Sequence, residues 1–581
     1  MTARNDRPNI IFILSDQQRA DTMGCYGQSL PVTPNLDALA REGVLFENAF
    51  TPQPVCGPAR SCLQTGKYAT ETRCFRNGIA LQPGSETIAT LLSRSGYETC
   101  YVGKWHLAST HNRAADYDLE PDIDFRTKPI PPERRGGYVD FWVAADVLEA
   151  TSHGHGGGYM YDRDMKKVTF DKYRVDGVTD FIIDCLEKRD KGKPFFLFCS
   201  YIEPHHQNDH GCYEGPKGSK EMFRDYIVPG DLEGTKGDWQ ENYPDYLGCC
   251  WSIDANFKRI RDVLSARGML DNTLIIYTSD HGSHFRTRND EYKRSCHDAC
   301  LRVPLIIRGP GFAGGVKIRQ LVSLIDLPPT ILVAAGITPP SYMRGRPLQE
   351  LVTGKGEDWP DDVFAQISES QVGRCLRTAK WKYSVSAPGL NGGFNAHGTY
   401  YLEEFLYDLE KDPHERTNLV DDASLEGIRK DLAGRLARKM AGAGEHVPLI
   451  LQRSRLALPP EQQVAGRIFV DECGSLAIAT FAVQTNIATP IDIPLVDVLE
   501  DFMDVPVILT AGDVDHAGIV RNEGGEPVLV DEMGRSRALK ELLSPVLPAR
   551  MLILHPPRPE SKAAPRFQLF FFKDHGLTPA R

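Results

Sequence analysis

Four apolar runs, each followed by polar side chains suited to catalysis or metal binding, constrain this chain more than any other feature. The runs at residues 9–14, 97–103, 195–201 and 272–279 are rich in aromatic and β-branched residues, as in strands of a sheet covered on both faces. Open α/β sheets bind their ligands at the carboxyl ends of the strands. The sequence therefore predicts an α/β domain whose functional site lies at one edge of a central sheet.

Pairs of polar residues stand where such a site would lie. They are Asp16 with Gln17, Lys104 with His106, His205 with His206, and Asp280 with His281. Lys104 and His106 alternate along a strand, so we expect both on one face, where they would suit a tetrahedral oxyanion. Read alone, Asp16 fits a turn or a helix cap as well as a metal ligand, and Lys104 with His106 fits an exposed strand end.

A cysteine stands where a loop turns into a predicted helix, within residues 54–66. Pro58 fits the first turn of that helix, where its missing N–H costs nothing. Cys56 would gain from the free N–H groups and the dipole of the helix, and Arg60, one turn on, can point back at it. The same residues also fit a buried loop cysteine beside a surface arginine.

The stretch Cys56-Gly57-Pro58-Ala59-Arg60, followed by Leu63-Gln64-Thr65-Gly66, resembles the signature of the type I, formylglycine-dependent sulfatases of the alkaline phosphatase-like superfamily. Further blocks resemble that family in the family's order, and the resemblance covers roughly residues 7–450. It implies an α/β fold with a large mixed β-sheet sandwiched by helices and a smaller C-terminal antiparallel sheet.

The resemblance implies a role for each matching residue. Cys56 would be oxidised to formylglycine by the formylglycine-generating enzyme, and one hydroxyl of its hydrate would attack the sulfur of a sulfate ester. His205 would protonate the leaving alcohol, with His206 as the fallback, and His106 would accept a proton as sulfate is expelled. The cations expected around the sulfate are Arg60, Lys104 and Lys293.

The resemblance also implies one divalent metal ion. Its expected ligands are Asp16, Gln17, Cys56, Asp280 and His281. The family carries an acidic residue where this chain has Gln17, whose amide still offers a carbonyl oxygen; similar Asp-Gln pairs occur in choline sulfatases and phosphonate monoester hydrolases. A set dominated by oxygen donors suits Ca²⁺ best, with Mn²⁺ or Mg²⁺ as alternatives.

Three functions fit these residues. The first is hydrolysis of a sulfate ester, such as that of a small molecule or a sulfated oligosaccharide. The second is a hydrolase of the same fold that acts on phosphonate monoesters or phosphodiesters. The third is a non-enzymatic binding relative, which would have no need of Cys56.

The composition restricts the binding partners and the cellular compartment that we expect for this chain. A net charge of −11 argues against a nucleic-acid partner, and no apolar run approaches the length of a membrane span. The short apolar run after the N-terminus reads as a strand rather than a signal peptide. The 14 cysteines show no disulfide or zinc spacing, so we expect free thiols and a cytoplasmic location.

The chain divides into three predicted segments: a catalytic domain at 1–362, a small β subdomain at 363–450, and an α/β or α+β extension at 451–581 without catalytic signature. We expect a helix over 319–336, and a role for the extension in oligomerisation or at the rim of the cleft. The variable segment 108–175 is predicted to contact substrate. It holds His153 and His155, two histidines that without a third ligand do not define a metal site.

Overall fold

The computed structural model describes most of the first 451 residues and separate stretches beyond them. The described ranges are 7–111, 114–189, 192–387, 390–398, 400–445, 447–451, 465–470, 476–480, 492–494, 506–511, 514–523, 526–530, 535–543, 549–554 and 567–573.

The chain forms two compact units. The first comprises Met1–Ser386, Leu390–Gly398 and Phe405–Val447, and the second comprises Ala387–Gly389, Thr399–Glu404 and Pro448–Arg581. The first unit thus holds both the large sheet and most of the small one. The domain limits expected at 362 and 450 stay predictions.

The large sheet has 11 strands. Ten of them lie in the order β11 (Val316–Ser323), β2 (Val44–Phe50), β10 (Leu305–Arg308), β8 (Thr273–Ser279), β1 (Asn9–Ser15), β7 (Phe195–Ser200), β3 (Glu98–Lys104), β4 (Phe141–Ala145), β5 (Gly158–Asp162) and β6 (Lys167–Phe170). The short β9 (Arg302–Val303) pairs with β2. The sheet is mixed, as expected from the family resemblance.

Five neighbouring strands in the middle of this sheet run in parallel. β8, β1, β7, β3 and β4 each pair in parallel with the next. Every residue of β1, β7 and β8 is buried, and Phe12 stacks on Phe198 with ring centroids 4.6 Å apart. The carboxyl ends of these strands therefore meet along one edge, although the strands are far apart in the sequence.

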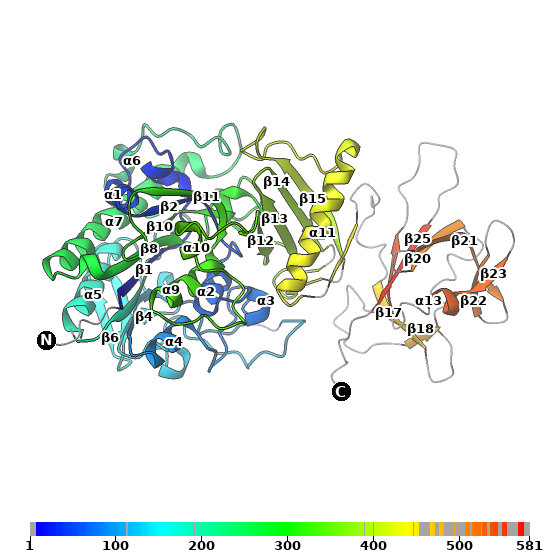
Figure 1. Cartoon of the computed structure of the whole chain (residues 1–581), viewed down its shortest axis with the longest axis horizontal. Helices are drawn as coiled ribbons and strands as arrows, with labels where there is room; N and C mark the ends of the chain where they lie inside the picture. Colours follow the sequence, from blue (N-terminus) through cyan, green and yellow to red (C-terminus); the bar gives the residue numbers. More distant parts are fainter. Residues whose placement is uncertain are drawn as a thin grey trace. The chain divides into compact units, whose positions relative to one another are not determined.

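Helices cover both faces of the sheet (Figure 1). On one face Ile11 and Ile13 of β1 share an apolar cluster with residues of α1 (Pro34–Glu42), α5 (Arg174–Lys188) and α7 (Trp239–Ala266). On the other, Phe12 packs with residues of α2 (Cys56–Thr65), α4 (Ile88–Arg94), α9 (Leu327–Ala334) and α10 (Gln349–Val352). The short helices α3 (Ala69–Thr72), α6 (Ser219–Met222) and α8 (Asp298–Leu301) lie in the connections.

The helix predicted over 319–336 is wrong in its first half. β11 continues to Ser323, and Leu321, Val322 and Ser323 pair in parallel with β2. The helix α9 begins only at Leu327. The sheet edge supplies hydrogen bonds that override the local helical pattern.

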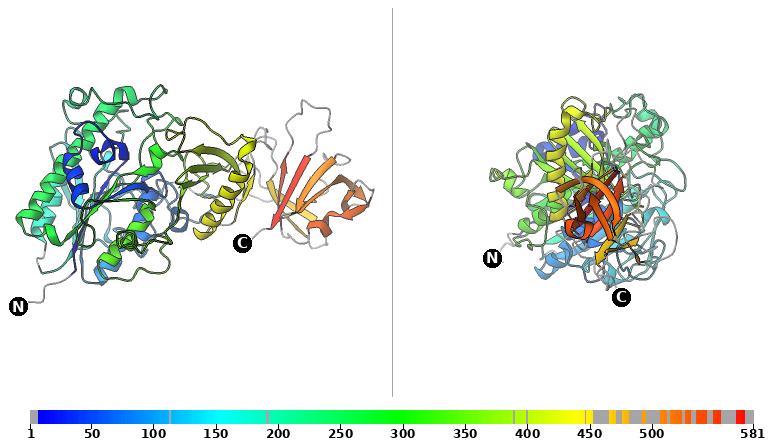
Figure 2. Two further views of the ribbon diagram at one scale, coloured as in Figure 1. Left: turned by 45° about the horizontal axis from the view of Figure 1, so that its top comes forward. Right: turned by 90° about the vertical axis from the view of Figure 1, so that its right-hand side faces the viewer.

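The small sheet has the strands β12 (Asp362–Ile367), β13 (Gly373–Thr378), β14 (Trp381–Ser386), β15 (Tyr400–Asp408) and β16 (Leu449–Leu451), in that order. β12, β13 and β14 pair antiparallel, whereas β16 adds to β15 in parallel. The helix α11 (Glu426–Gly442) packs on β13 and β14 and buries Leu432, Leu436 and Met440 (Figure 2).

The second unit contains a nine-stranded sheet. Its order is β19 (Asp492–Pro494), β18 (Leu476–Thr480), β17 (Ala465–Val470), β24 (Ala549–Leu554), β25 (Phe567–Lys573), β20 (Pro506–Ala511), β21 (Val514–Glu523), β22 (Glu526–Val530) and β23 (Ser536–Ala538). The described part of this unit also includes the short helix α13 (Leu539–Leu543). The apolar runs of the extension thus become strands, and its role stays a prediction. Within the described ranges, no helix combines the length and hydropathy needed to span a bilayer.

Candidate active site

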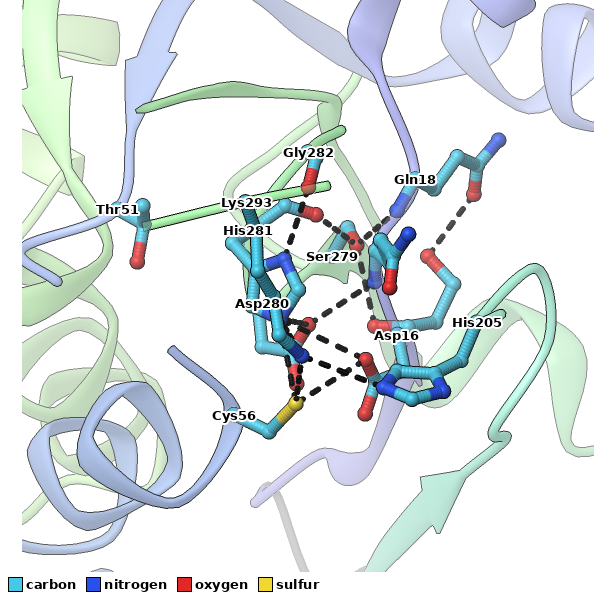
Figure 3. Close-up of polar contacts among 12 residues, drawn as sticks. Asp16, Gln18, Thr51, Cys56, His205, Ser279, Asp280, His281, Gly282 and Lys293 are labelled. Carbon is cyan, nitrogen blue, oxygen red and sulfur yellow. Dashed lines mark hydrogen bonds and ion pairs between the residues drawn. The ribbon is translucent and has the colours of Figure 1, made fainter. Parts of the chain in front are cut away.

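Cys56 opens helix α2 at the edge where the parallel strands end (Figure 3). The preceding residue, Val55, is extended, so Cys56 is the first helical residue and lies at the positive end of the helix dipole. Every residue of α2 is buried, and Cys56 itself is 1% exposed. The predicted position of this cysteine at a helix start matches the structure.

Two carboxylates and two cations form a buried network beside Cys56. Asp16, which follows β1, accepts hydrogen bonds at Oδ2 from Lys104 Nζ at 2.7 Å and Arg60 Nη2 at 3.0 Å. Asp280, which follows β8, accepts from Arg60 Nε at Oδ2 at 3.2 Å. All four side chains are at most 2% exposed, so removal of one partner would leave an uncompensated buried charge.

The network shifts the pKa values of the two carboxyls in opposite directions. Burial raises the pKa of Asp16, but the charges of Lys104, His205 and Arg60 outweigh it and hold that pKa below the usual range. Burial and the negative charge of Asp16 raise the pKa of Asp280. A cation bound between these carboxylates would relieve their mutual repulsion.

Arg60 serves the carboxylates rather than the cysteine. Besides Asp16 and Asp280, its guanidinium donates through Nη1 to the carbonyl of Lys104 at 2.9 Å and to Ser200 Oγ at 2.6 Å. The expectation that Arg60 points back at Cys56 is therefore corrected. The two carboxylates, which follow β1 and β8, attract the guanidinium more strongly than a thiol does.

The thiol of Cys56 faces three polar groups. Its Sγ lies 2.9 Å from Lys293 Nζ, 3.2 Å from His281 Nε2 and 3.4 Å from Asp16 Oδ1. Burial opposes ionisation, but the charges of Lys104 and Lys293 outweigh it and hold the pKa of Cys56 well below its ordinary value. The side chain at position 56 therefore sits where positive charge favours an anion.

His205, after β7, lies between a cation and a carboxylate. Its Nε2 is 3.2 Å from Lys293 Nζ, and its Nδ1 is 3.2 Å from Glu149 Oε2. Burial and Lys293 would lower the pKa of His205, but Tyr292 and Asp16 raise it to about 10. Burial would raise the pKa of Glu149, but the charge of His205 lowers it to about 2.

His106 and His206 are placed differently from what the sequence predicts. β3 ends at Lys104, and His106 has a φ of 60°, so the two are not alternating residues of one strand. His106 nevertheless contributes to the lowered pKa of Cys56. His206 turns away from Lys293, stacks on Tyr292 at 5.1 Å, and contacts Asn208 at 3.3 Å through Nδ1.

A buried group suited to a metal ion occupies the centre of the site. One ligand atom each from Asp16, Cys56, Asp280 and His281 lies within 4.8 Å of the others. His281 Nδ1 contacts the carbonyl of Gly282 at 2.9 Å, which makes Nδ1 the donor and leaves the lone pair of Nε2 for a metal. Its Nε2 lies 3.6 Å from an oxygen of each carboxylate.

Gln17 supplies an independent sign that a cation fits here. Its Oε1 is buried and has no hydrogen-bond partner, whereas its Nε2 donates to Tyr213 Oη at 2.7 Å. An unpartnered buried oxygen is costly unless an ion or water satisfies it. Gln17 also has a φ of 70°, and its carbonyl accepts from Tyr246 Oη at 2.6 Å. The donor set present therefore fits one divalent metal.

The structure thus brings the predicted metal ligands and cations together near Cys56, with His205 next to Lys293. The fallback acid His206 instead contacts Tyr292 and Asn208. Sequence reasoning missed the supporting residues Glu149, Ser200, Tyr213, Tyr246 and Ser283. Their contacts with His205, Arg60 and Gln17 depend on tertiary approach, and no local pattern marks them. For Glu149 the one available signal was its place in the loop segment assigned to substrate contacts.

Comparison with known proteins identifies the family. The family described as sulfatase matches residues 8–337. This chain belongs to the sulfatase family. The C-terminal region of N-sulphoglucosamine sulphohydrolase matches residues 290–442 in addition, so this sulfatase also carries the family's smaller β region.

Individual relatives extend over most of the sulfatase. It is 27% identical over 509 residues to N-acetylglucosamine-6-O-sulfatase of Bacteroides thetaiotaomicron, covering 73% of this chain and 85% of that protein. A protein solved with its substrate D-glucosamine-2-N,6-O-disulfate has a TM-score of 0.59 at 24% identity, covering 75% of this chain and 98% of that one. Phosphonate monoester hydrolase of Agrobacterium radiobacter has a TM-score of 0.57 at 21% identity, covering 82% and 100%.

Proposed function

We propose that this sulfatase hydrolyses the sulfate ester of a carbohydrate to the alcohol and inorganic sulfate. The observation that carries the proposal is the cluster of buried cations around Cys56. Lys104 and Arg60 hold Asp16, and Lys293 lies 2.9 Å from the Cys56 sulfur. Fixed positive charge in a water-poor site is the main means of stabilising charge that develops on a transferring anionic group.

Cys56 is the proposed site of conversion to formylglycine by a formylglycine-generating enzyme. The sulfur of the cysteine marks where the modified side chain would stand. The hydrated aldehyde supplies a hydroxyl nucleophile and a second hydroxyl that lets sulfate be expelled, which neither cysteine nor serine can do. The buried helix start and the Lys293 ammonium hold that side chain in one orientation.

Asp16, Gln17, Asp280 and His281 are the proposed ligands of one divalent metal, together with the side chain at position 56. A bound metal supplies Lewis acidity that stabilises charge on the sulfate and its attacking oxygen. Because most of these donors are oxygens, we propose Ca²⁺ rather than Mn²⁺ or Mg²⁺.

His205 is the proposed general acid. Its Nδ1 faces the Glu149 carboxylate, so the proton available to a leaving alcohol stands on Nε2, next to Lys293. A pKa near 10 keeps the ring protonated at neutral pH. His106, which contributes to the lowered pKa of Cys56, is the proposed acceptor of the proton released when sulfate leaves.

A carbohydrate is favoured as the leaving group because relatives that act on sugars match over most of the chain. The 6-O-sulfatase of Bacteroides thetaiotaomicron is one such relative. The match of residues 290–442 to the C-terminal region of N-sulphoglucosamine sulphohydrolase agrees with it over a shorter stretch. The phosphonate monoester hydrolase supports a second candidate, cleavage of phosphonate monoesters or phosphodiesters, through likeness of fold. A sulfated hexosamine is the proposed first substrate to assay.

A direct assay separates the candidates. Purified, metal-loaded protein is given a 6-O-sulfated glucosamine, nitrophenyl sulfate and a phenyl phosphonate ester at equal concentrations. We expect the highest kcat/KM for a sulfate ester. A higher value for the phosphonate would overturn the proposal in favour of the second candidate. Mass spectrometry of the same sample should show the peptide around Cys56 with one sulfur and two hydrogens replaced by one oxygen, the change from cysteine to formylglycine.

Two further features of the protein are proposed. The cysteines that the structure describes are all free thiols, which supports a reducing compartment and a cytoplasmic location. The second unit, with its nine-stranded sheet and no residue of the site, is proposed to act in homo-oligomer assembly.

A further inference from the structure

Two loops of the first unit bring a second group of metal-binding side chains together on its surface. His153 lies between residues 151 and 157, ahead of β5, and Asp209 with His210 follows His205 in the loop after β7. One potential ligand atom from each of these three residues lies within 4.8 Å of the others. The structure thus groups His153 with two ligands from another loop, whereas His155 of the same tract takes no part.

The side chains already stand close to a chelating arrangement. His153 Nε2 is 2.8 Å from Asp209 Oδ2, and the rings of His153 and His210 are parallel within 4°, with centroids 4.3 Å apart. Two ligand atoms bound tetrahedrally to one zinc ion lie roughly 3.3 Å apart. A small widening of the His153–Asp209 contact therefore admits an ion.

Outer partners orient two of the three ligands. His210 Nδ1 is 2.5 Å from Glu214 Oε1, and the other oxygen of Glu214 accepts from the backbone N–H of Gly154. The carboxylate makes Nδ1 the donor and leaves the lone pair of His210 Nε2 for a metal, as in carboxylate–histidine–zinc sites. The second oxygen of Asp209 accepts from Gln207 Nε2 at 2.6 Å.

We propose that His153, Asp209 and His210 form a second metal site, selective for a borderline transition ion such as Zn²⁺. Two imidazoles and one carboxylate match a three-ligand zinc site that keeps a position for water. The side chains are 38%, 57% and 47% exposed, so an ion can enter from solvent. The oxygen-rich group around Asp16 and Asp280 favours a harder ion, which separates the two sites by chemistry.

Charge considerations favour a metal over a pair of protonated histidines. Two imidazolium rings stacked at 4.3 Å would repel each other, whereas two neutral rings can each give a lone pair to one cation.

A bound ion would join the loop of the proposed general acid to its neighbour. Asn208, next to Asp209, donates to Glu149 Oε1 at 3.0 Å, and Glu149 faces His205. One segment carries Glu149 and His153, and the other carries His205 and Asp209. The two segments thus meet both at Glu149 and at His153. An ion bound by His153, Asp209 and His210 would order the loop that carries His205.

Calorimetric titration of Zn²⁺ into full-length protein, kept in excess Ca²⁺, tests the assignment. We expect one zinc site per chain in the native protein. His153→Ala and Asp209→Asn should each weaken it by more than the roughly 10- to 100-fold that loss of an outer partner costs. His155→Ala is the matched control in the same loop, because its Nε2 contacts the carbonyl of Gly215 at 2.8 Å instead.

Each outcome decides the matter. No zinc binding by the native protein, or equal affinity in all four proteins, would overturn the site. Loss of binding in His155→Ala as well would overturn it too, since the fold of the loop and not the named ligands would then be responsible. A melting curve of each variant in Ca²⁺ alone verifies that it is folded, and cobalt substitution should give visible absorption bands of nitrogen coordination only where zinc binds.

Discussion

Replacing Glu149 by glutamine would remove one negative charge from beside the proposed acid and leave the shape of the site intact. The carboxylate oxygen stands 3.2 Å from His205 Nδ1, and the Glu149 side chain is 21% exposed. A neutral amide at that position stabilises the protonated imidazole less. The pKa of His205, about 10 in the native protein, should therefore fall toward its ordinary value.

The size of the shift follows from the distance. Two unit charges 3.2 Å apart interact by about 1.3 kcal/mol in water and by about 5 kcal/mol at an effective dielectric constant of 20. One pKa unit corresponds to about 1.36 kcal/mol. A partly buried pair lies between these limits, so the expected fall is about 1 to 4 units. A bound divalent metal lowers the pKa of His205 in both proteins, so the difference between them is the quantity to compare.

The assay is the pH dependence of kcat/KM for an alkyl or sugar sulfate. His205 acts in its protonated form, so the rate falls as the pH rises through its pKa. Glu149→Gln should move this alkaline limb to lower pH by at least about one unit. Nitrophenyl sulfate, whose leaving group needs little help from an acid, should show a smaller change.

Glu149→Asp keeps the charge and serves as the control. Its alkaline limb should stay nearer the native position than that of Glu149→Gln. An unchanged alkaline limb in a folded Glu149→Gln protein, on the alkyl or sugar sulfate, would refute the assignment of Glu149 and His205 as a working pair.

Other consequences of the structure can be measured separately. Asp280→Ala removes a buried carboxylate from the metal group, and elemental analysis should find the metal lost together with turnover. Phe12→Ala removes a ring stacked on Phe198 in the middle of the sheet and should cost about 3–5 kcal/mol of unfolding free energy, seen as a lower melting temperature. A chain ending after residue 450 should show a smaller particle mass in light scattering if the extension assembles oligomers, whereas a raised KM confined to bulky substrates would indicate a role at the rim of the cleft. Unchanged mass and kinetics would exclude both roles.

The sequence predicted the parts of the site that depend on strand ends. Asp16 and Asp280 each follow a continuous apolar run, and parallel pairing of β1 with β8 brings the two aspartates to one edge. Lys104 is the last residue of β3 and His205 follows β7, and these two strands complete the same row. A continuous apolar run can be recognised in the sequence alone, so these strands and the residues at their ends could be predicted.

The sequence failed where tertiary contacts decide. Leu321 and its neighbours look helical but pair with β2 because the sheet edge offers them hydrogen bonds. Arg60 turns to the carboxylates of two distant strands rather than to Cys56. Glu149 lies in a loop without periodicity, and only the folded chain brings it to His205. Contacts between segments more than forty residues apart leave no local trace.

The burial of Cys56 limits the time in which its proposed conversion to formylglycine can take place. The thiol is enclosed by Asp16, which follows β1, and by His281 and Lys293, which follow β8. β8 ends 223 residues after the cysteine (279 − 56). At translation rates of roughly 5–20 residues per second, the nascent chain exposes this cysteine for about 10–45 seconds before its last covering strand exists. If the proposed formylglycine-generating enzyme acts only on unfolded chain, it competes with folding in that interval. The yield of active protein is then fixed during synthesis, and slowing translation should raise it.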